Sequence, residues 1–303
     1  MNIKTFSIKI DEYFSIIENH SIDKNTFYHS KEWLSLIITN NLEIKIIKSV
    51  DENNNFLAVT PYFSMRKSIF QFYGSPLSGA YTEFLGPVFK IKLNDSIKFS
   101  ILQSQHLFLK KKTQYIELGF KYDSIEKYEY LKGLKKYNYI KSERNSLILD
   151  LQKGEEYIWN NFKSRARNMI RKSENNDIEI CFYEPNTEWF NSYYLMLQKT
   201  FKKQNKSVPH SLNFYLNLDK LDSSNLLCIS GLKNKEIIAS AIFIIDSDRM
   251  MYFSGTSNEY GMKYAANSLI QWHAILYGIK NDLSTYDFGG IGISSIDKFK
   301  ESF

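Results

Sequence analysis

The chain has 303 residues, of which 43% are hydrophobic and 24% charged, with only 13 glycines and 5 prolines. This composition excludes a disordered or collagen-like protein, and the length suffices for about two domains with sizeable cores. The net charge of +6 indicates a mild preference for anionic partners, well short of a dedicated nucleic-acid binder.

The two cysteines indicate a reducing compartment, and the longest apolar run is too short to span a membrane. Cys181 and Cys228 lie in apolar strand-like segments and are expected to be small buried hydrophobic residues. The amino terminus lacks the apolar segment of a signal peptide, and the apolar run over residues 237–245 is far shorter than the roughly 20 residues of a membrane span. These features predict a cytoplasmic protein, for which peripheral contact with a membrane surface stays open.

Hydrophobic periodicity predicts the elements of the first half. The expected strands are residues 4–10, 43–50, 56–65 and 114–120, with another inside 139–151. The expected helices are residues 11–19, a helix beginning near Ser30, 95–112 and 124–136, and a loop-rich aromatic region covers 74–87.

The second half repeats this alternation. Its expected helices are residues 155–174, 187–204, 211–221 and 268–280, and its expected strands are 178–183, 226–231, 236–246, 250–255 and a strand end at 286–288. Ser268 and Gln271 predict a capping box at the start of the last helix. With no low-complexity linker between the halves, the sequence predicts an α/β (α+β) protein of two similar lobes, residues 1–150 and 151–303.

Several kinds of functional site are excluded by missing motifs. The chain has no GxxxxGK[ST] phosphate loop and no GxSxG nucleophile elbow. Residues 289–292 lack the third glycine of a dinucleotide-binding fingerprint. The five histidines show no metal-ligand spacing, so no metal site is predicted.

Three stretches remain that could bind an anion. Lys163, Arg167 and Arg171 recur every four residues of an expected helix, which makes either a solvated basic face or a face for an anionic ligand. Residues 256–266, which include Lys263, are either an ordinary strand-to-helix connection or a phosphate or carboxylate site at the start of a helix. Lys300 follows an aromatic residue in what is either a frayed basic terminus or part of a site.

These stretches, in this order, resemble motifs of the Fem family of peptidyltransferases and its acyltransferase relatives. The family's Lys-x-Arg-x-x-Ile-Arg-x-Ala helix motif is similar to residues 163–173, with Ser173 where alanine is usual. Its G-x-S-x-E-Y … N-x-L-x-W-x-A-I signature is similar to residues 255–275, its D-x-G-G motif to 287–290 and its terminal F-K to 299–300. In the first half, residues 29–34 resemble the start of the family's first-lobe helix.

The resemblance implies two GNAT-like lobes, each a mixed, mostly antiparallel sheet flanked by helices. It also implies an enzyme that transfers an acyl or aminoacyl group to an amine of a cell-envelope precursor, a peptidoglycan stem peptide or an amino sugar, by direct attack without a covalent enzyme intermediate. No tightly bound cofactor is expected, and the co-substrate is aminoacyl-tRNA or acyl-CoA. The implied partners are a phosphate-bearing or lipid-linked precursor and, with an aminoacyl donor, a charged tRNA.

The resemblance also suggests roles for individual residues. Arg167, helped by Arg171, would hold the precursor's phosphates, and Lys300, oriented by Phe299, would stabilise the charge that develops on the carbonyl oxygen. A base would take a proton from the amine. The candidate bases are Asp287 and Glu259, and further candidate substrate-binding residues are Tyr260 and Lys263.

Two alternatives to an aminoacyl transferase of cell-wall synthesis stay open. The first is an acyl-CoA-dependent N-acyltransferase of polysaccharide biosynthesis, although residues 256–268 do not match the coenzyme A pattern Gln/Arg-x-x-Gly-x-Gly/Ala. The second is a non-catalytic protein that binds such a precursor. The coiled-coil arm of some relatives is absent, which weakens the case for tRNA, and the retained Arg167, Asp287 and Lys300 weaken the case for a non-catalytic protein.

Overall fold

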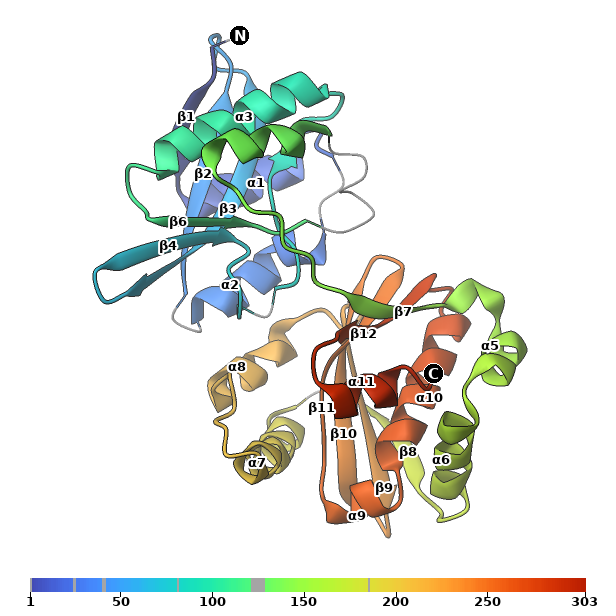
Figure 1. The fold of residues 1–303 in the computed structure, drawn as a ribbon. Coiled ribbons are helices and arrows are strands. Elements are labelled where there is room, and N and C mark those ends of the chain that lie inside the picture. Colours follow the sequence, from blue (N-terminus) through green and yellow to red (C-terminus); the bar gives the residue numbers. More distant parts are fainter. Residues whose placement is uncertain (1, 24–25, 40–41, 81, 121–128, 185) are drawn as a thin grey trace. The chain divides into compact units, whose positions relative to one another are not determined.

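The computed structural model describes residues 2–23, 26–39, 42–80, 82–120, 129–184 and 186–303. The chain forms two compact units, Met1–Ser142 and Glu143–Phe303, which Figure 1 colours from blue to green and from green to red. The division falls before the expected junction at residue 150. The reason is that β7 (Ser146–Asp150) pairs with β12 (Thr285–Gly290) and so belongs to the second sheet.

The first unit contains a six-stranded sheet with the order β1-β2-β3-β4-β6, in which β5 also pairs with β3. The pairs along this order are antiparallel except for β4 with β6. The strands are β1 (Lys4–Ile8), β2 (Glu43–Val50), β3 (Phe56–Lys67), β4 (Phe70–Ser75), β5 (Val88–Phe89) and β6 (Tyr115–Leu118). The helices are α1 (Ile10–Asn19), α2 (Lys31–Thr39), α3 (Asp95–Leu109) and the 3-10 helices η1 (Phe27–His29) and η2 (Glu129–Tyr137).

The second unit contains a six-stranded sheet with the order β7-β12-β11-β10-β9-β8. Its pairs are antiparallel except for β11 with β12. Besides β7 and β12, the strands are β8 (Glu179–Tyr183), β9 (Leu226–Lys233), β10 (Glu236–Asp246) and β11 (Arg249–Ser257). The helices are α5 (Glu155–Asn161), α6 (Ser164–Glu174), α7 (Thr187–Lys203), α8 (Leu212–Leu216), α9 (Glu259–Lys263), α10 (Ala266–Lys280), α11 (Ser294–Lys300) and the 3-10 helices η3 (Leu151–Lys153) and η4 (Asn217–Lys220).

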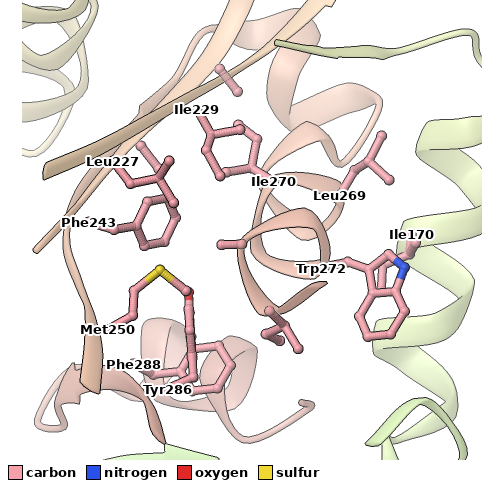
Figure 2. Close-up of a cluster of buried hydrophobic side chains, with 14 of the residues drawn as sticks. Ile170, Leu227, Ile229, Phe243, Met250, Leu269, Ile270, Trp272, Tyr286 and Phe288 are labelled. Carbon is pink, nitrogen blue, oxygen red and sulfur yellow. The ribbon is translucent and has the colours of Figure 1, made fainter. Parts of the chain in front are cut away.

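The core of the second unit lies between the sheet and α10. Phe243 of β10, Met250 of β11 and Tyr286 of β12 meet Ile270 of α10 there, and Trp272 extends the cluster toward α6 (Figure 2). The helices α7 and α8 lie on the other side of the sheet (Figure 1). Because helices cover both faces, the eight central residues of β10 are buried in succession, as expected for a strand with no solvated face.

Several elements differ from those expected from the sequence. The helix expected over 155–174 is divided into α5 and α6, with Phe162 and Lys163 extended between them. The last long helix begins at Ala266, two positions before the expected capping box, and Ala265 at its N-cap has a left-handed backbone without a side-chain cap. The sequence did not predict several short elements, among them β4, β5, α9 and α11. Residues 121–128, the start of another expected helix, lie outside the described residues, and Glu129–Tyr137 is a 3-10 helix.

Within the described part of the chain, no helix combines the length and the hydrophobicity that crossing a membrane requires.

Candidate functional site

The pairing between β11 and β12 covers only the first residues of each strand. Arg249, Met250 and Met251 pair in parallel with Thr285, Tyr286 and Asp287. Beyond Asp287, β12 turns through Gly289, which has φ +76°, and Gly290 pairs with Ser146 of β7. The carboxyl end of β12 therefore leaves β11 at the D-x-G-G motif, and the candidate catalytic residues Asp287 and Lys300 meet around this turn.

Asp287 is completely buried and ion-paired with Arg249. Its Oδ2 also accepts a hydrogen bond from the Ser146 hydroxyl at 3.3 Å, and its Oδ1 accepts one from the Gly289 N–H at 2.6 Å. Both oxygens are thus engaged by β7, β11 and the glycine turn. These three partners hold the Asp287 carboxylate in one orientation between the two strands and the turn.

Lys300 lies at the end of α11 and is only 8% exposed. Its Nζ donates a hydrogen bond of 2.7 Å to the Gly290 carbonyl. A β-carbon on Gly289 would lie 3.8 Å from this Nζ and 3.5 Å from the Tyr252 carbonyl oxygen, so the turn brings Lys300 close to β11. The result is a largely desolvated cation, fixed by a backbone carbonyl, beside the point where β11 and β12 separate.

Phe299 packs on the end of the chain. Its ring lies edge to face against Phe303 at 5.3 Å, and Phe303 in turn contacts Phe162 at 5.2 Å and Phe288 at 5.3 Å. The Lys163 N–H donates to the Ser302 carbonyl at 2.9 Å. These contacts attach the segment that carries Lys300 both to β12 and to the joint between α5 and α6.

Arg167 is half-buried at the joint between α5 and α6. Its Nη1 donates to the carbonyl oxygens of Trp159, at 3.3 Å, of Asn160, at 3.0 Å, and of Phe162. These carbonyls belong to the end of α5, where helix carbonyls lack intrahelical partners. Arg167 therefore caps α5, a role that the four-residue spacing of the basic stripe did not indicate.

The other cation assigned to phosphate binding, Arg171, is exposed on α6. Its guanidinium carbon lies 5.5 Å from the centre of the Trp159 ring, within the range of a cation–π contact. Because Arg167 caps the helix on which Trp159 lies, both arginines act on the same short segment, and the Lys163 contact with Ser302 connects it to the Lys300 segment.

The remaining three candidates form a separate surface group on α9. Tyr260 is 60% exposed and its ring stacks at 6.4 Å on Tyr264, and the Lys263 ammonium lies 5.3 Å from the same ring. Glu259 pairs with Lys203 at 2.9 Å, and this hydrogen bond and charge lower the pKa of its carboxyl group. The group follows the last residue of β11, whereas Asp287 lies opposite Met251, so about 20 Å of strand separates the two.

The site includes residues that the sequence did not single out. Arg249 and Ser146 lie beside Asp287 only because of the strand order β7-β12-β11. Tyr252 has a pKa raised to about 12 by burial, and its hydroxyl occupies the position that a β-carbon on Gly255 would take. Gly255 begins the G-x-S-x-E-Y signature, and its physical role is to leave room for this hydroxyl.

No cluster of histidine, cysteine, aspartate or glutamate that could hold a metal ion occurs among the residues that the structure describes. Lys300 and Arg249 bring two cations to the β12 turn, where Arg249 pairs with the Asp287 carboxylate and the Lys300 ammonium donates to the Gly290 carbonyl. Such a site suits an anionic group or a developing oxyanion.

The fold places the chain among proteins of two GNAT-like lobes. It is similar to FemX, at 12% sequence identity and a TM-score of 0.67 over 99% of this chain and 93% of that one. It is also similar to a tandem GNAT protein from the clavulanic acid biosynthesis pathway, at 5% identity and a TM-score of 0.54 over 99% and 94% of the two chains. A third similar structure is the C-terminal domain of a putative lysylphosphatidylglycerol synthetase from Agrobacterium fabrum, at 8% identity and a TM-score of 0.52 over 97% and 85%.

Within this class the chain is similar to the FemAB family over its last quarter. Residues 227–303, which carry the β12 turn and Lys300, match the FemAB family, and FemX shares the fold over nearly the whole chain. The resemblance inferred from the motifs is therefore confirmed. No curated protein sequence matches the chain.

Proposed function

We propose that this protein transfers an acyl or aminoacyl group to an amine of a cell-envelope precursor, a peptidoglycan stem peptide or an amino sugar. In the proposed reaction, the amine nitrogen attacks the carbonyl carbon of an ester or thioester donor and forms a tetrahedral intermediate with an anionic oxygen. The intermediate collapses with loss of the donor's alkoxide or thiolate. No covalent bond to the protein forms at any step.

The observation that carries the proposal is the buried ammonium of Lys300 beside the β12 turn. A fixed cation in a poorly hydrated site stabilises an oxyanion far more than one in water, because solvent does not screen it. The match of residues 227–303 to the FemAB family, which includes this lysine, supports the same role.

Asp287 takes a different role in this proposal from that of a base. Its ion pair with Arg249 and its hydrogen bond from Gly289 suit a positioning residue that fixes the turn presenting the Gly290 carbonyl to Lys300. Glu259 is paired with Lys203, and most of the length of β11 separates it from Asp287. The amine therefore enters as the free base and loses its proton to solvent.

For substrate binding, we propose that Arg171 and the donors of Arg167 that do not cap α5 hold the phosphates of the precursor. An arginine has five N–H donors, so a guanidinium can cap a helix and bind an anion at once. Phe299 is proposed to line the same region. Lys263 and Tyr260 lie just before the first turn of α10, whose positive dipole end favours a phosphate, and are proposed to contact the donor.

The donor is either aminoacyl-tRNA or acyl-CoA. The similar putative lysylphosphatidylglycerol synthetase is named for an aminoacylated lipid, whereas the similar tandem GNAT protein is described in a form without AcCoA. Both donors present a carbonyl to be attacked and phosphates to be bound, so the proposed site accommodates the chemistry of either.

The test is transfer of a radiolabelled acyl group from acyl-CoA or from aminoacyl-tRNA to a nucleotide-linked stem-peptide precursor or an amino sugar. Lys300→Met keeps the apolar stem and removes the charge, and we expect turnover to fall by about 10²- to 10³-fold, the usual effect of removing one oxyanion donor. Lys298→Met, at an exposed position of the same helix, is the matched control and should leave turnover unchanged.

Two outcomes would overturn the proposal. Equal turnover of Lys300→Met and Lys298→Met would show that the buried ammonium does not stabilise the oxyanion. Tight binding of the precursor without transfer from either donor would favour a non-catalytic binding protein.

A further inference from the structure

The β3–β4 hairpin of the first unit ends in an exposed apolar tip. The turn consists of Ser68 and Ile69, and Ile69 is 77% exposed, whereas Phe70 and Met65 on the two strands are 49% and 40% exposed. In Figure 1 this hairpin extends past the helices that cover the sheet of its unit. Hydrophobic side chains of this size at the apex of a projecting turn expose apolar surface at a net cost in water unless something covers them.

The strand register extends this apolar surface across the sheet. Met65 of β3 lies opposite Phe72 of β4, and Phe72 lies opposite Tyr115 of β6. Residues directly opposite one another point to the same face of a sheet, so these three side chains form one row. Tyr115 is 45% exposed and its ring lies 5.6 Å from that of Phe72. We call Met65, Ile69, Phe70 and Tyr115 the apolar tip.

Five cations lie on the two segments next to the apolar tip, and one of them, Lys112, has its ammonium 4.4 Å from the Phe108 ring. Arg66 and Lys67 precede the turn, and the connection from α3 to β6 adds three consecutive lysines, all of them exposed. This connection lies beside the hairpin because the Thr113 hydroxyl and the Gln114 N–H both donate to the Gln71 carbonyl, at 2.5 and 3.3 Å. We call the following set the basic rim: Arg66, Lys67, Lys110, Lys111 and Lys112.

The carboxylates of the neighbouring strands lie farther from the turn and are engaged. Glu43 is opposite Ser64 and pairs with Lys45. Glu117 is opposite Gly74, and its two oxygens accept hydrogen bonds from the Ser78 N–H and hydroxyl at 2.9 and 2.5 Å. The cations of the rim are therefore not neutralised by acidic side chains of these strands.

We propose that the apolar tip and basic rim dock on the surface of an anionic lipid bilayer. Large apolar side chains at the apex of a turn can enter the boundary between head groups and acyl chains, while the surrounding lysines and arginine contact anionic head groups. A protein surface would offer complementary carboxylates. The combination of a narrow apolar tip with nearby cations, which pair with no acidic side chain among the residues that the structure describes, matches the layered chemistry of a membrane surface. This surface lies entirely within the first unit and does not depend on the proposed acyl transfer.

The test is co-sedimentation of the full chain with vesicles of phosphatidylcholine alone or with one third phosphatidylglycerol. We expect binding to the anionic vesicles that weakens with salt. Ile69→Ser should lower the partition coefficient about tenfold, the effect of withholding most of one isoleucine side chain from the apolar phase. Ile140→Ser, at a position that is 92% exposed in the same unit, is its control.

The second part of the test removes positive charges from the basic rim. The double variant Lys111→Gln/Lys112→Gln should lower binding by roughly fivefold for each cation removed, whereas Lys135→Gln, an exposed lysine on η2, should not. Absence of vesicle binding, or equal binding to neutral and anionic vesicles, would overturn the proposal. Light scattering that shows self-association of the chain, lost in Ile69→Ser, would overturn it in favour of an interface between two copies.

Discussion

The buried ion pair between Arg249 and Asp287 predicts a large loss of stability when one partner is removed. Asp287 is fully buried and the Arg249 side chain is only 10% exposed, so Arg249→Met removes the paired cation and leaves the buried carboxylate with two hydrogen bonds. Breaking a buried pair in this way costs about 3–5 kcal/mol. For a unit of this size, the melting temperature should fall by roughly 6–20 °C.

The assay is urea and thermal unfolding followed by tryptophan fluorescence and circular dichroism. Three of the four tryptophans, Trp159, Trp189 and Trp272, belong to the second unit, whereas Trp33 belongs to the first. The fluorescence transition of the second unit should therefore shift, and the part of the circular dichroism signal that comes from the first unit should not.

Two further variants make this reasoning refutable. Arg249→Met/Asp287→Asn removes the unpaired charge but keeps an oxygen to accept from the Gly289 N–H, so it should recover part of the lost stability. Arg165→Met, at an exposed position of α6, should change stability by no more than about 0.5 kcal/mol. A loss below about 1 kcal/mol in Arg249→Met, or a double variant less stable than the single one, would refute the assignment.

Three other results are expected. Arg167→Ala should destabilise the second unit by about 1–3 kcal/mol, because it leaves the carbonyls at the end of α5 without their donor, whereas Lys163→Ala should not; equal unfolding midpoints would contradict the capping role. Burial lowers the pKa of His29 to about 4, so the unfolded chain takes up a proton below pH 6.5 while the folded chain does not. The free energy of unfolding of the first unit should therefore fall by about 3 kcal/mol between pH 6.5 and 4, and His29→Gln should reduce this loss. An unchanged pH dependence in His29→Gln would contradict the assignment of this loss to His29. Burial also raises the pKa of the Cys228 thiol, so iodoacetamide should modify Cys181 in the folded protein and Cys228 only after unfolding, which mass spectrometry of the modified peptides would check.

The strands with strong local patterns could be predicted from the sequence. β2 and β10 have the expected bounds, because β2 is set off by the asparagine-rich turn after it and β10 is a long apolar run between polar residues. The short elements α9 and α11 could not be predicted, since helices of five and seven residues do not repeat a pattern often enough to reveal a period. β4 was not predicted either, because its six residues are too few to show a clear alternation and its last two fall in the expected loop of residues 74–87.

The break between α5 and α6 shows why a correct pattern can still give the wrong element. The apolar positions of residues 155–174 keep a helical period across the break, so nothing local indicates an interruption. Long-range contacts favour it instead: the Phe162 ring packs against Trp272 and Phe303, and the Lys163 N–H pairs with the Ser302 carbonyl. Tertiary contacts of this kind routinely outweigh a modest helix propensity.

The same break changes what the basic stripe means for the site. In a continuous helix, Arg167 would project one turn from Lys163 and Arg171 on a common face. In the structure its guanidinium turns back to the carbonyls that the break exposes, and Arg171 lies over Trp159 on the helix that Arg167 caps. The break that the sequence could not reveal therefore orients both arginines, and the Lys163 contact connects them to the segment of Lys300. A variant that weakened the α5–α6 joint would thus disturb the phosphate-binding residues and the catalytic lysine of the proposed reaction together, so changes in precursor affinity and in turnover should accompany one another.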